Sequence, residues 1–146
     1  MLLCLKCFKT YKQKTIKNNT CKIKGCQGEV VEIDELFIPV IAELNKKRYI
    51  SKYCCSGHIC DYPNSYIYFE DDIVLPSFPE GYMYDQDMYP QVNWSKYEIT
   101  KTIRKEFDNG KSLNELSKDI YNNALSVLDW AEELPELDKD WEDTTI

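Results

Sequence analysis

The chain has 146 residues, about the size of one ordinary domain, so it can bury a hydrophobic core without disulfides. Its 43% of hydrophobic residues is too high for a disordered chain, and its 29% of charged residues argues against a membrane protein. The net charge of -7 is unevenly spread, because residues 1–30 carry seven lysines and one acid, a charge of +6, which leaves -13 for the other 116 residues.

The N-terminal segment does not read as a signal peptide or a membrane span, because Lys6 and Lys9 interrupt its apolar residues. We therefore expect a cytoplasmic protein with no membrane partner. In a reducing compartment, seven cysteines are better explained as metal ligands and buried thiols than as disulfides, and an odd number cannot pair completely.

Four of the cysteines have the spacing of a zinc ribbon. Cys4 and Cys7 form a Cys-x2-Cys pair, and after thirteen residues Cys21 and Cys26 form a Cys-x4-Cys pair, with glycines nearby for tight turns. Zinc prefers thiolate ligands in tetrahedral geometry, and two such pairs fill its coordination shell. The pattern predicts one structural zinc ion; the alternative is a small β-appendage with reduced, partly buried cysteines.

The lysines around this ribbon suggest a nucleic-acid contact. Clustered positive charge neutralises phosphates, and Phe8 and Tyr11 are placed to stack on bases. The alternative is a lysine-rich face that is simply solvated.

The middle of the chain alternates between strand and helix patterns. Residues 30–33 predict a strand, and Asp34 is a suitable cap for a helix over 35–47. Residues 49–55 and 66–70 are rich in β-formers and predict two further strands.

The pattern is less regular towards the second half. Residues 76–90 hold three prolines and predict a long irregular loop with several tyrosines. Residues 97–103 fit a strand that leads to a turn at 108–110, although a four-residue apolar spacing also fits a helix there. A capping box at Ser112 and Glu115 begins a helix that we expect to reach about residue 134.

These elements predict an α+β fold, in which an N-terminal zinc ribbon is followed by a small antiparallel sheet packed by two helices. The expected boundaries are 1–33 for the ribbon, 34–134 for the α+β domain and 135–146 for an acidic C-terminal tail. The acidic run at 132–143 is either solvated or able to imitate a nucleic-acid strand on a basic partner.

A second group of reactive residues follows the strand at 49–55. Cys54, Cys55 and Cys60 surround the turn Ser56-Gly57-His58, and this group suggests a second metal site, or a thiolate and base pair at Cys55 and His58. Packing of the cysteines in the core is the alternative. Small residues in the turn also favour an anion cradle of backbone amides.

A ligand pocket is a further hypothesis for the same turn. The aromatic segment 82–94, which begins with Tyr82 and Tyr84, is long enough to fold over Ser56, Gly57 and His58 and to stack a purine. Arg104 is a candidate for the same pocket. Alternatively, the tyrosines cover a sheet edge.

Two resemblances follow from these residues. The helix, strand and Cys55-Ser56-Gly57 turn resemble the tRNA wybutosine-synthesis methyltransferase-like fold over residues 35–105, which implies methyl-donor binding; that family usually has arginine at the position of His58 and lacks the ribbon. Residues 42–58 more closely resemble uncharacterised zinc-ribbon proteins of phages and low-GC bacteria, which implies a phage or mobile-element accessory protein.

The sequence favours binding over catalysis, because it contains no recognisable hydrolase or kinase motif. The expected function is that of a small zinc-binding accessory protein that binds a host protein or nucleic acid, for example to inhibit a defence system. The alternative is a nucleotide or signal-molecule binder, or a methyltransferase-like enzyme, that uses the Cys-Ser-Gly-His turn.

Overall fold

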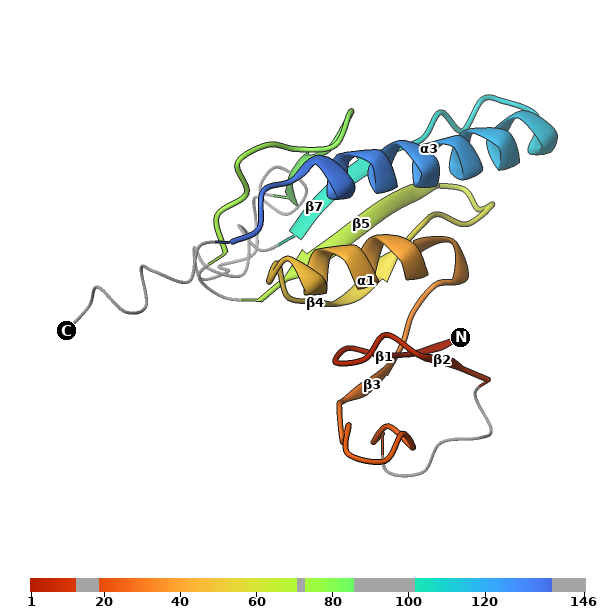
Figure 1. Ribbon diagram of the computed structural model, residues 1–146. Coiled ribbons are helices and arrows are strands. Elements are labelled where there is room, and N and C mark those ends of the chain that lie inside the picture. Colours follow the sequence, from red (N-terminus) through yellow and green to blue (C-terminus); the bar gives the residue numbers. More distant parts are fainter. Residues whose placement is uncertain (13–18, 71–72, 86–101, 138–146) are drawn as a thin grey trace, which may run out of the picture.

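The computed structural model of the chain describes residues 1–12, 19–70, 73–85 and 102–137. Over these residues the fold is α+β, with a three-stranded sheet, a four-stranded sheet and two α-helices. The helices run along one side of the larger sheet, and the smaller sheet, which carries the N-terminus, lies below them (Figure 1). None of the helices in the described ranges is long and apolar enough to cross a membrane.

The smaller sheet is antiparallel and has the strand order β2-β1-β3. Its strands are short: β1 (Leu2–Cys4), β2 (Thr10–Tyr11) and β3 (Val30–Glu32). The predicted strand at 30–33 is thus confirmed as β3, and it pairs with β1 so that Cys4 lies opposite Val30. This register places the first cysteine pair beside the segment that follows the second pair.

The larger sheet is also antiparallel, with the order β4-β5-β7-β6. Its strands are β4 (Ser51–Cys55), β5 (Asn64–Phe69), β6 (Met83–Tyr84) and β7 (Thr102–Glu106). In β5, Ser65, Ile67 and Phe69 are buried while the residues between them are partly exposed. This alternation means that one face of the sheet is buried and the other is open.

The helices follow their predicted caps closely. Asp34 accepts a hydrogen bond from the Leu36 backbone N–H at 3.3 Å, and the segment begins as the 3₁₀ turn η2 (Glu35–Phe37) before α1 (Ile38–Lys46). The helix α3 (Leu113–Glu133) begins at the predicted capping box, in which Ser112 Oγ accepts from the Glu115 N–H at 3.2 Å.

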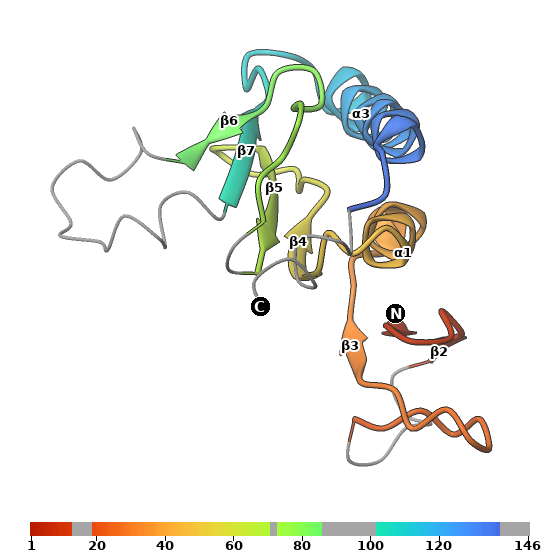
Figure 2. The same cartoon turned by 60° about the vertical axis from the view of Figure 1, so that its left-hand side comes forward.

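Both helices cover the same face of the larger sheet, as Figure 2 shows. The core between them and the sheet is aliphatic and aromatic, with fully buried side chains from α1, α3 and the strands: Val40, Ile41, Leu44, Ile67, Ile103 and Val127. Leu3 of the smaller sheet and Ile33 belong to the same cluster. The smaller sheet therefore packs on the α+β body and shares its core.

Two sequence expectations differ from the structure. The predicted irregular loop at 76–90 contains a strand, because Met83 and Tyr84 pair with Arg104 and Ile103 and so cover the edge of β7. The predicted strand at 97–103 is confirmed from Thr102 and continues to Glu106, whereas residues 97–101 lie outside the described part of the chain, as do 86–90 of the loop.

The start of the predicted C-terminal tail is held against the body. Tyr49 Oη donates a hydrogen bond to the Pro135 carbonyl at 2.6 Å, and the Leu137 N–H donates to the Lys47 carbonyl at 2.9 Å. Pro135 and Leu137 are thus held against the segment that ends α1, and residues 138–143 of the acidic run lie outside the described residues.

Candidate metal centre and the adjacent cleft

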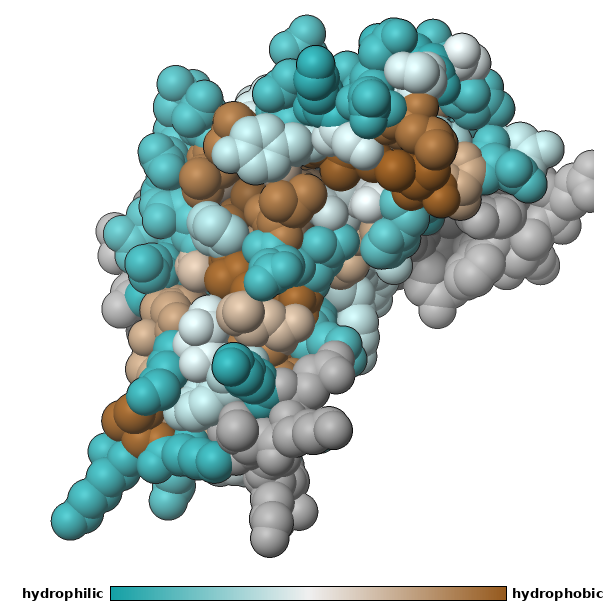
Figure 3. Space-filling view, turned by 90° about the vertical axis from the view of Figure 1, so that its right-hand side faces the viewer, coloured by the Kyte–Doolittle hydropathy of each residue, from teal (hydrophilic) through white to brown (hydrophobic). Residues whose placement is uncertain are grey.

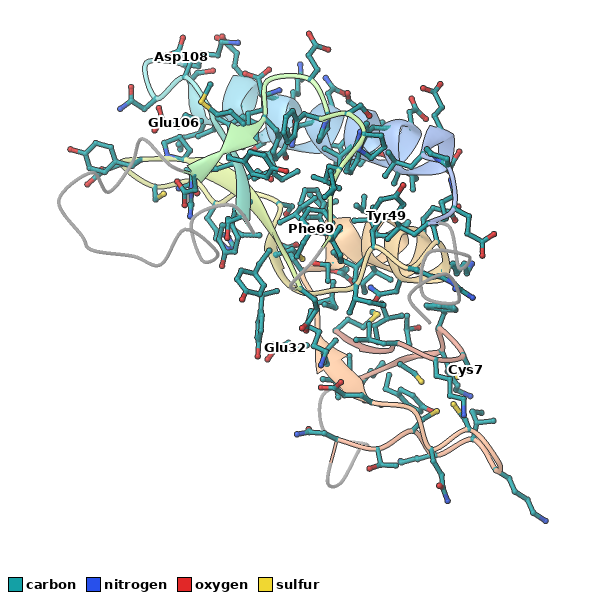
Figure 4. The ribbon with its side chains drawn as sticks, turned by 90° about the vertical axis from the view of Figure 1, so that its left-hand side faces the viewer. Cys7, Glu32, Tyr49, Phe69, Glu106 and Asp108 are labelled. Atoms are coloured by element: carbon teal, nitrogen blue, oxygen red, sulfur yellow. The ribbon has the colours of Figure 1, made fainter. Side chains whose placement is uncertain are left out.

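The smaller sheet brings the four predicted cysteine ligands together. Cys4 Sγ lies 3.7 Å from Cys26 Sγ, Cys7 Sγ lies 3.6 Å from Cys21 Sγ, and all four sulfur atoms lie within 4.8 Å of one another. Cys7 is exposed, and the other three are buried. Figure 4 shows the Cys7 side chain among the other sulfur atoms of this end of the molecule.

The backbone around the cysteines is shaped for a close approach to sulfur. The N–H groups of Lys6 and Cys7 point at Cys4 Sγ, at 3.4 and 3.5 Å. Gly28 lies so near that a Cβ at this position would be 2.7 Å from Cys4 Sγ and 3.3 Å from Cys26 Sγ. Only a residue without a side chain fits there, which explains the glycine two residues after Cys26.

Tyr11 adds a contact that the sequence analysis missed. Its hydroxyl lies 3.1 Å from Cys21 Sγ, and this hydrogen bond is the main cause that lowers the pKa of Cys21 to about 6. The same hydrogen bond raises the pKa of Tyr11 to about 12. A hydroxyl that donates to Cys21 Sγ favours the thiolate, the form in which cysteine binds metals.

The four cysteines can therefore hold one metal ion. The sulfur atoms converge on one point, backbone donors face one of them, and the glycine leaves room for the turn. This arrangement fits a closed shell of four thiolates, which leaves no position for a substrate.

A cleft of about 1010 Å³ lies between the smaller sheet and the open face of the larger sheet. Tyr53 and Tyr66 line it from β4 and β5, and Tyr53 is 65% exposed. The Tyr53 ring meets Tyr68 edge to face, with centroids 5.9 Å apart. Sequence reasoning missed these residues as site residues, although strand alternation opposite buried Ile67 would have placed Tyr66 and Tyr68 on the open face.

Arg104 also lines the cleft, but its charge is already engaged. Its guanidinium lies 4.9 Å from the centroid of the Tyr66 ring, and it donates to Asn64 Oδ1 at 2.5 Å and to Asp85 Oδ2 at 2.9 Å. These contacts fix the planar guanidinium against the sheet and hold the Tyr66 ring in place.

Carboxylates dominate the opposite wall of the cleft. Glu29, Glu32 and Glu35 line it from β3 and its flanks, and Figure 4 shows Glu32 at the junction of the two sheets. Lys52 also lines the cleft, but it pairs with Glu29 at 2.9 Å and with Glu70 at 3.7 Å. The cleft is thus an aromatic surface with an acidic border.

The Ser56-Gly57-His58 turn sits at one end of the cleft. Ser56 is buried, and both its N–H and its hydroxyl donate to Asp34 Oδ2, at 3.0 and 2.7 Å. A Cβ on Gly57 would lie 3.0 Å from Phe107 and 3.1 Å from Ile120. The turn is therefore packed from behind by Phe107 and α3, and only His58 of the three faces the cleft.

The two predicted pocket tyrosines lie elsewhere among the described residues. Tyr82 is buried, donates its hydroxyl hydrogen to Ser65 Oγ at 2.6 Å and accepts from Asn123 Nδ2 at 2.8 Å. The Tyr84 ring packs edge to face on the Phe78 ring, with the ring centroids 4.9 Å apart. Neither lines the cleft with His58 and Arg104, and residues 86–94 of the aromatic segment lie outside the described part of the chain.

The second cysteine group is divided by the structure. Cys54 packs against the core, and burial raises its pKa to about 12, whereas Cys60 is exposed. Cys55 and His58 instead come together with Asp34, and one ligand atom from each lies within 4.8 Å of the others. Asp34 was recognised in the sequence only as a helix cap, because nothing in the sequence places it beside a turn more than twenty residues away.

No protein-family model, curated protein or solved structure matches the chain. The function is therefore inferred from the geometry of the cysteine cluster and the cleft.

Proposed function

We propose that the four-cysteine cluster binds one zinc ion and that the protein uses the adjacent cleft to bind a positively charged segment of another protein. The zinc assignment rests on the donor set, because four thiolates select zinc over harder divalent cations. The ion closes the turns between β1, β2 and β3 and so fixes one wall of the cleft.

The single observation that carries the binding proposal is the acid-bordered aromatic cleft. Tyr53 and Tyr66 present large rings that bury apolar area at low entropic cost, which makes tyrosine frequent among the residues that dominate protein interfaces. Glu32 and Glu35 lie opposite and attract lysine or arginine side chains. A basic peptide segment satisfies both walls at once.

Direct nucleic-acid binding is the second candidate, and a separate surface supports it. Lys9, Lys22 and Lys24 are exposed on the smaller sheet and its loops. Figure 3 shows hydrophilic side chains projecting from this end of the molecule. The acidic cleft repels phosphates, so a nucleic acid would lie on these lysines alone, and its affinity would fall steeply with salt.

A small nucleotide or methyl-donor ligand is supported by one feature only. His58 and Arg104 line the same cleft, as the sequence interpretation requires. Arg104 already pairs with Asp85, however, and Tyr82 lies in the core. A thermal-shift screen of nucleotides and methyl donors tests this alternative, and it predicts a shift that His58→Ala abolishes.

The main proposal is tested by fluorescence anisotropy with labelled peptides that differ only in charge. We expect lysine- and arginine-rich peptides to bind and acidic peptides of the same length not to bind. Tyr53→Ala should weaken binding by roughly 30-fold, the effect of a hot-spot residue worth about 2 kcal/mol. Glu32→Lys should also weaken binding of the basic peptides, and the loss should grow as the salt concentration is lowered, because the new positive charge repels the peptide.

Tyr121→Ala is the matched control, because Tyr121 is also an exposed tyrosine but lies on α3. It should leave peptide affinity unchanged. The cleft assignment would be refuted if Tyr53→Ala and Tyr121→Ala lost peptide affinity equally, or if the wild-type chain bound acidic and basic peptides with equal affinity. Binding of single-stranded oligonucleotides with a steep salt dependence, lost when Lys22 and Lys24 are changed to glutamate, would favour the second candidate.

A further inference from the structure

We infer that Asp34, Cys55 and His58 form a second metal site, open to the cleft, for a divalent transition-metal ion such as zinc. The inference is independent of the peptide-binding proposal, since it concerns an ion and is measured by metal content. It starts from the three ligand atoms, one from each side chain, that lie within 4.8 Å of one another.

The donor set is chemically selective. A thiolate, an imidazole and a carboxylate are all ligands of zinc, with bonds of roughly 2.0–2.3 Å, whereas magnesium and calcium prefer oxygen ligands alone. The three ligand atoms all lie within 4.8 Å of one another, so a small side-chain movement is enough to bring them around one ion. His58 is exposed and supplies that movement by rotation of its side chain.

The other two ligands are held in place by the fold. Cys55 is the last residue of β4, and its carbonyl accepts a hydrogen bond from Ser65 Oγ at 2.8 Å. Asp34 Oδ2 accepts two hydrogen bonds from Ser56, which is 1% exposed. Such outer contacts orient metal-binding carboxylates in proteins.

Asp34 keeps capacity for a metal despite these bonds. A carboxylate has about four lone-pair directions. The two bonds from Ser56 and the bond from the Leu36 N–H at 3.3 Å use three of them. One direction remains for a cation.

The proposed site differs from the four-cysteine cluster in its open coordination. Three protein ligands leave at least one position for water or another ligand, which is the arrangement of exchangeable and catalytic zinc sites. Asp34, Cys55 and His58 all line the cleft, together with Tyr66 and Arg104. A ligand in the cleft therefore has direct access to the ion.

The test is a metal titration of the full chain. Zinc is added first at one equivalent to fill the tighter four-cysteine cluster, and Co²⁺ is then titrated as a spectroscopic probe. We expect a second equivalent to bind with visible d–d bands and one thiolate-to-cobalt charge-transfer band. His58→Ala and Cys55→Ser should each remove this second equivalent and retain the first.

Cys60→Ser is the matched control, because Cys60 is exposed in the same loop but lies outside the three-ligand group. It should still bind two equivalents. Ser56→Ala tests the orientation of Asp34 and should weaken cobalt binding about 10- to 100-fold. Retention of the first equivalent and an unchanged circular dichroism spectrum show that each variant is folded.

The inference is overturned if the wild-type chain binds only the first equivalent. It is also overturned if folded His58→Ala keeps the second equivalent, or if Cys60→Ser loses it. None of these results would alter the peptide-binding proposal, whose failure shows instead as equal affinity for basic and acidic peptides.

Discussion

Gly28 is the most stringent point at which to test the four-cysteine cluster. A methyl group added here would lie 2.5 Å from Lys6 Cβ and 2.7 Å from Cys4 Sγ, both well inside van der Waals contact. Neither neighbour is the far end of a flexible side chain, because Cys4 is buried in the cluster and the Lys6 contact is at its Cβ. The Gly28→Ala chain must therefore displace Cys4 or the turn that carries it.

The size of the effect follows from this overlap. Added methyl groups in well-packed sites cost about 1–3 kcal/mol, and a tenfold change in affinity corresponds to about 1.4 kcal/mol, so metal affinity should fall roughly 5- to 150-fold. The loss falls on metal binding because ligand placement and folding of such a small unit are coupled. The assay is competition for zinc with a chromogenic chelator, read by absorbance.

Gly110→Ala supplies the control. The added methyl group has one neighbour within 4 Å, Asp108 Oδ1 at 3.2 Å, in the turn before α3. Its zinc affinity should equal that of the wild-type chain. If Gly28→Ala binds zinc within a factor of two of both proteins, the packing argument for the cluster is wrong.

Two further predictions concern the body of the protein. Tyr82→Phe removes a hydroxyl that donates to Ser65 and accepts from Asn123 in the core, so urea denaturation should show a loss of about 1–3 kcal/mol; an unchanged midpoint would contradict the buried network. Cys60 should react with iodoacetamide well before Cys54, because burial raises the pKa of Cys54 to about 12 and keeps it protonated at pH 8. Raising the pH from 8 to 10 should accelerate the Cys54 reaction. The order of alkylation is read by peptide mapping with mass spectrometry, and modification of Cys54 before Cys60 would contradict the prediction.

Local patterns in the sequence were sufficient for the elements whose signals are local. The spacing of the cysteine pairs identified the cluster at Cys4, Cys7, Cys21 and Cys26, and the capping box at Ser112 located the start of α3. Spacing and capping are written within a few residues, so no knowledge of distant contacts is needed. The α+β class followed from the same alternation of elements.

The strand β6 and the position of Tyr82 could not be predicted in this way. Met83 and Tyr84 form a strand because β7 offers an edge for pairing. The segment around them is rich in proline and tyrosine and lacks the alternation of apolar and polar residues that predicts a strand. Tyr82 was expected to face a ligand, but Ser65 and Asn123 satisfy its hydroxyl in the core. Both outcomes depend on partners that are distant in the sequence.

By itself, then, the sequence determined which four cysteines could hold a metal ion together and where the helices begin, because those signals depend on neighbours along the chain. Tertiary structure alone decided that the smaller sheet shares the core through Leu3 and Ile33. It also decided that Asp34 meets Cys55 and His58, because the Ser56 hydrogen bonds join the segment after β3 to the end of β4. Contacts between segments this far apart arise only when the strands pair and the helices cover one face.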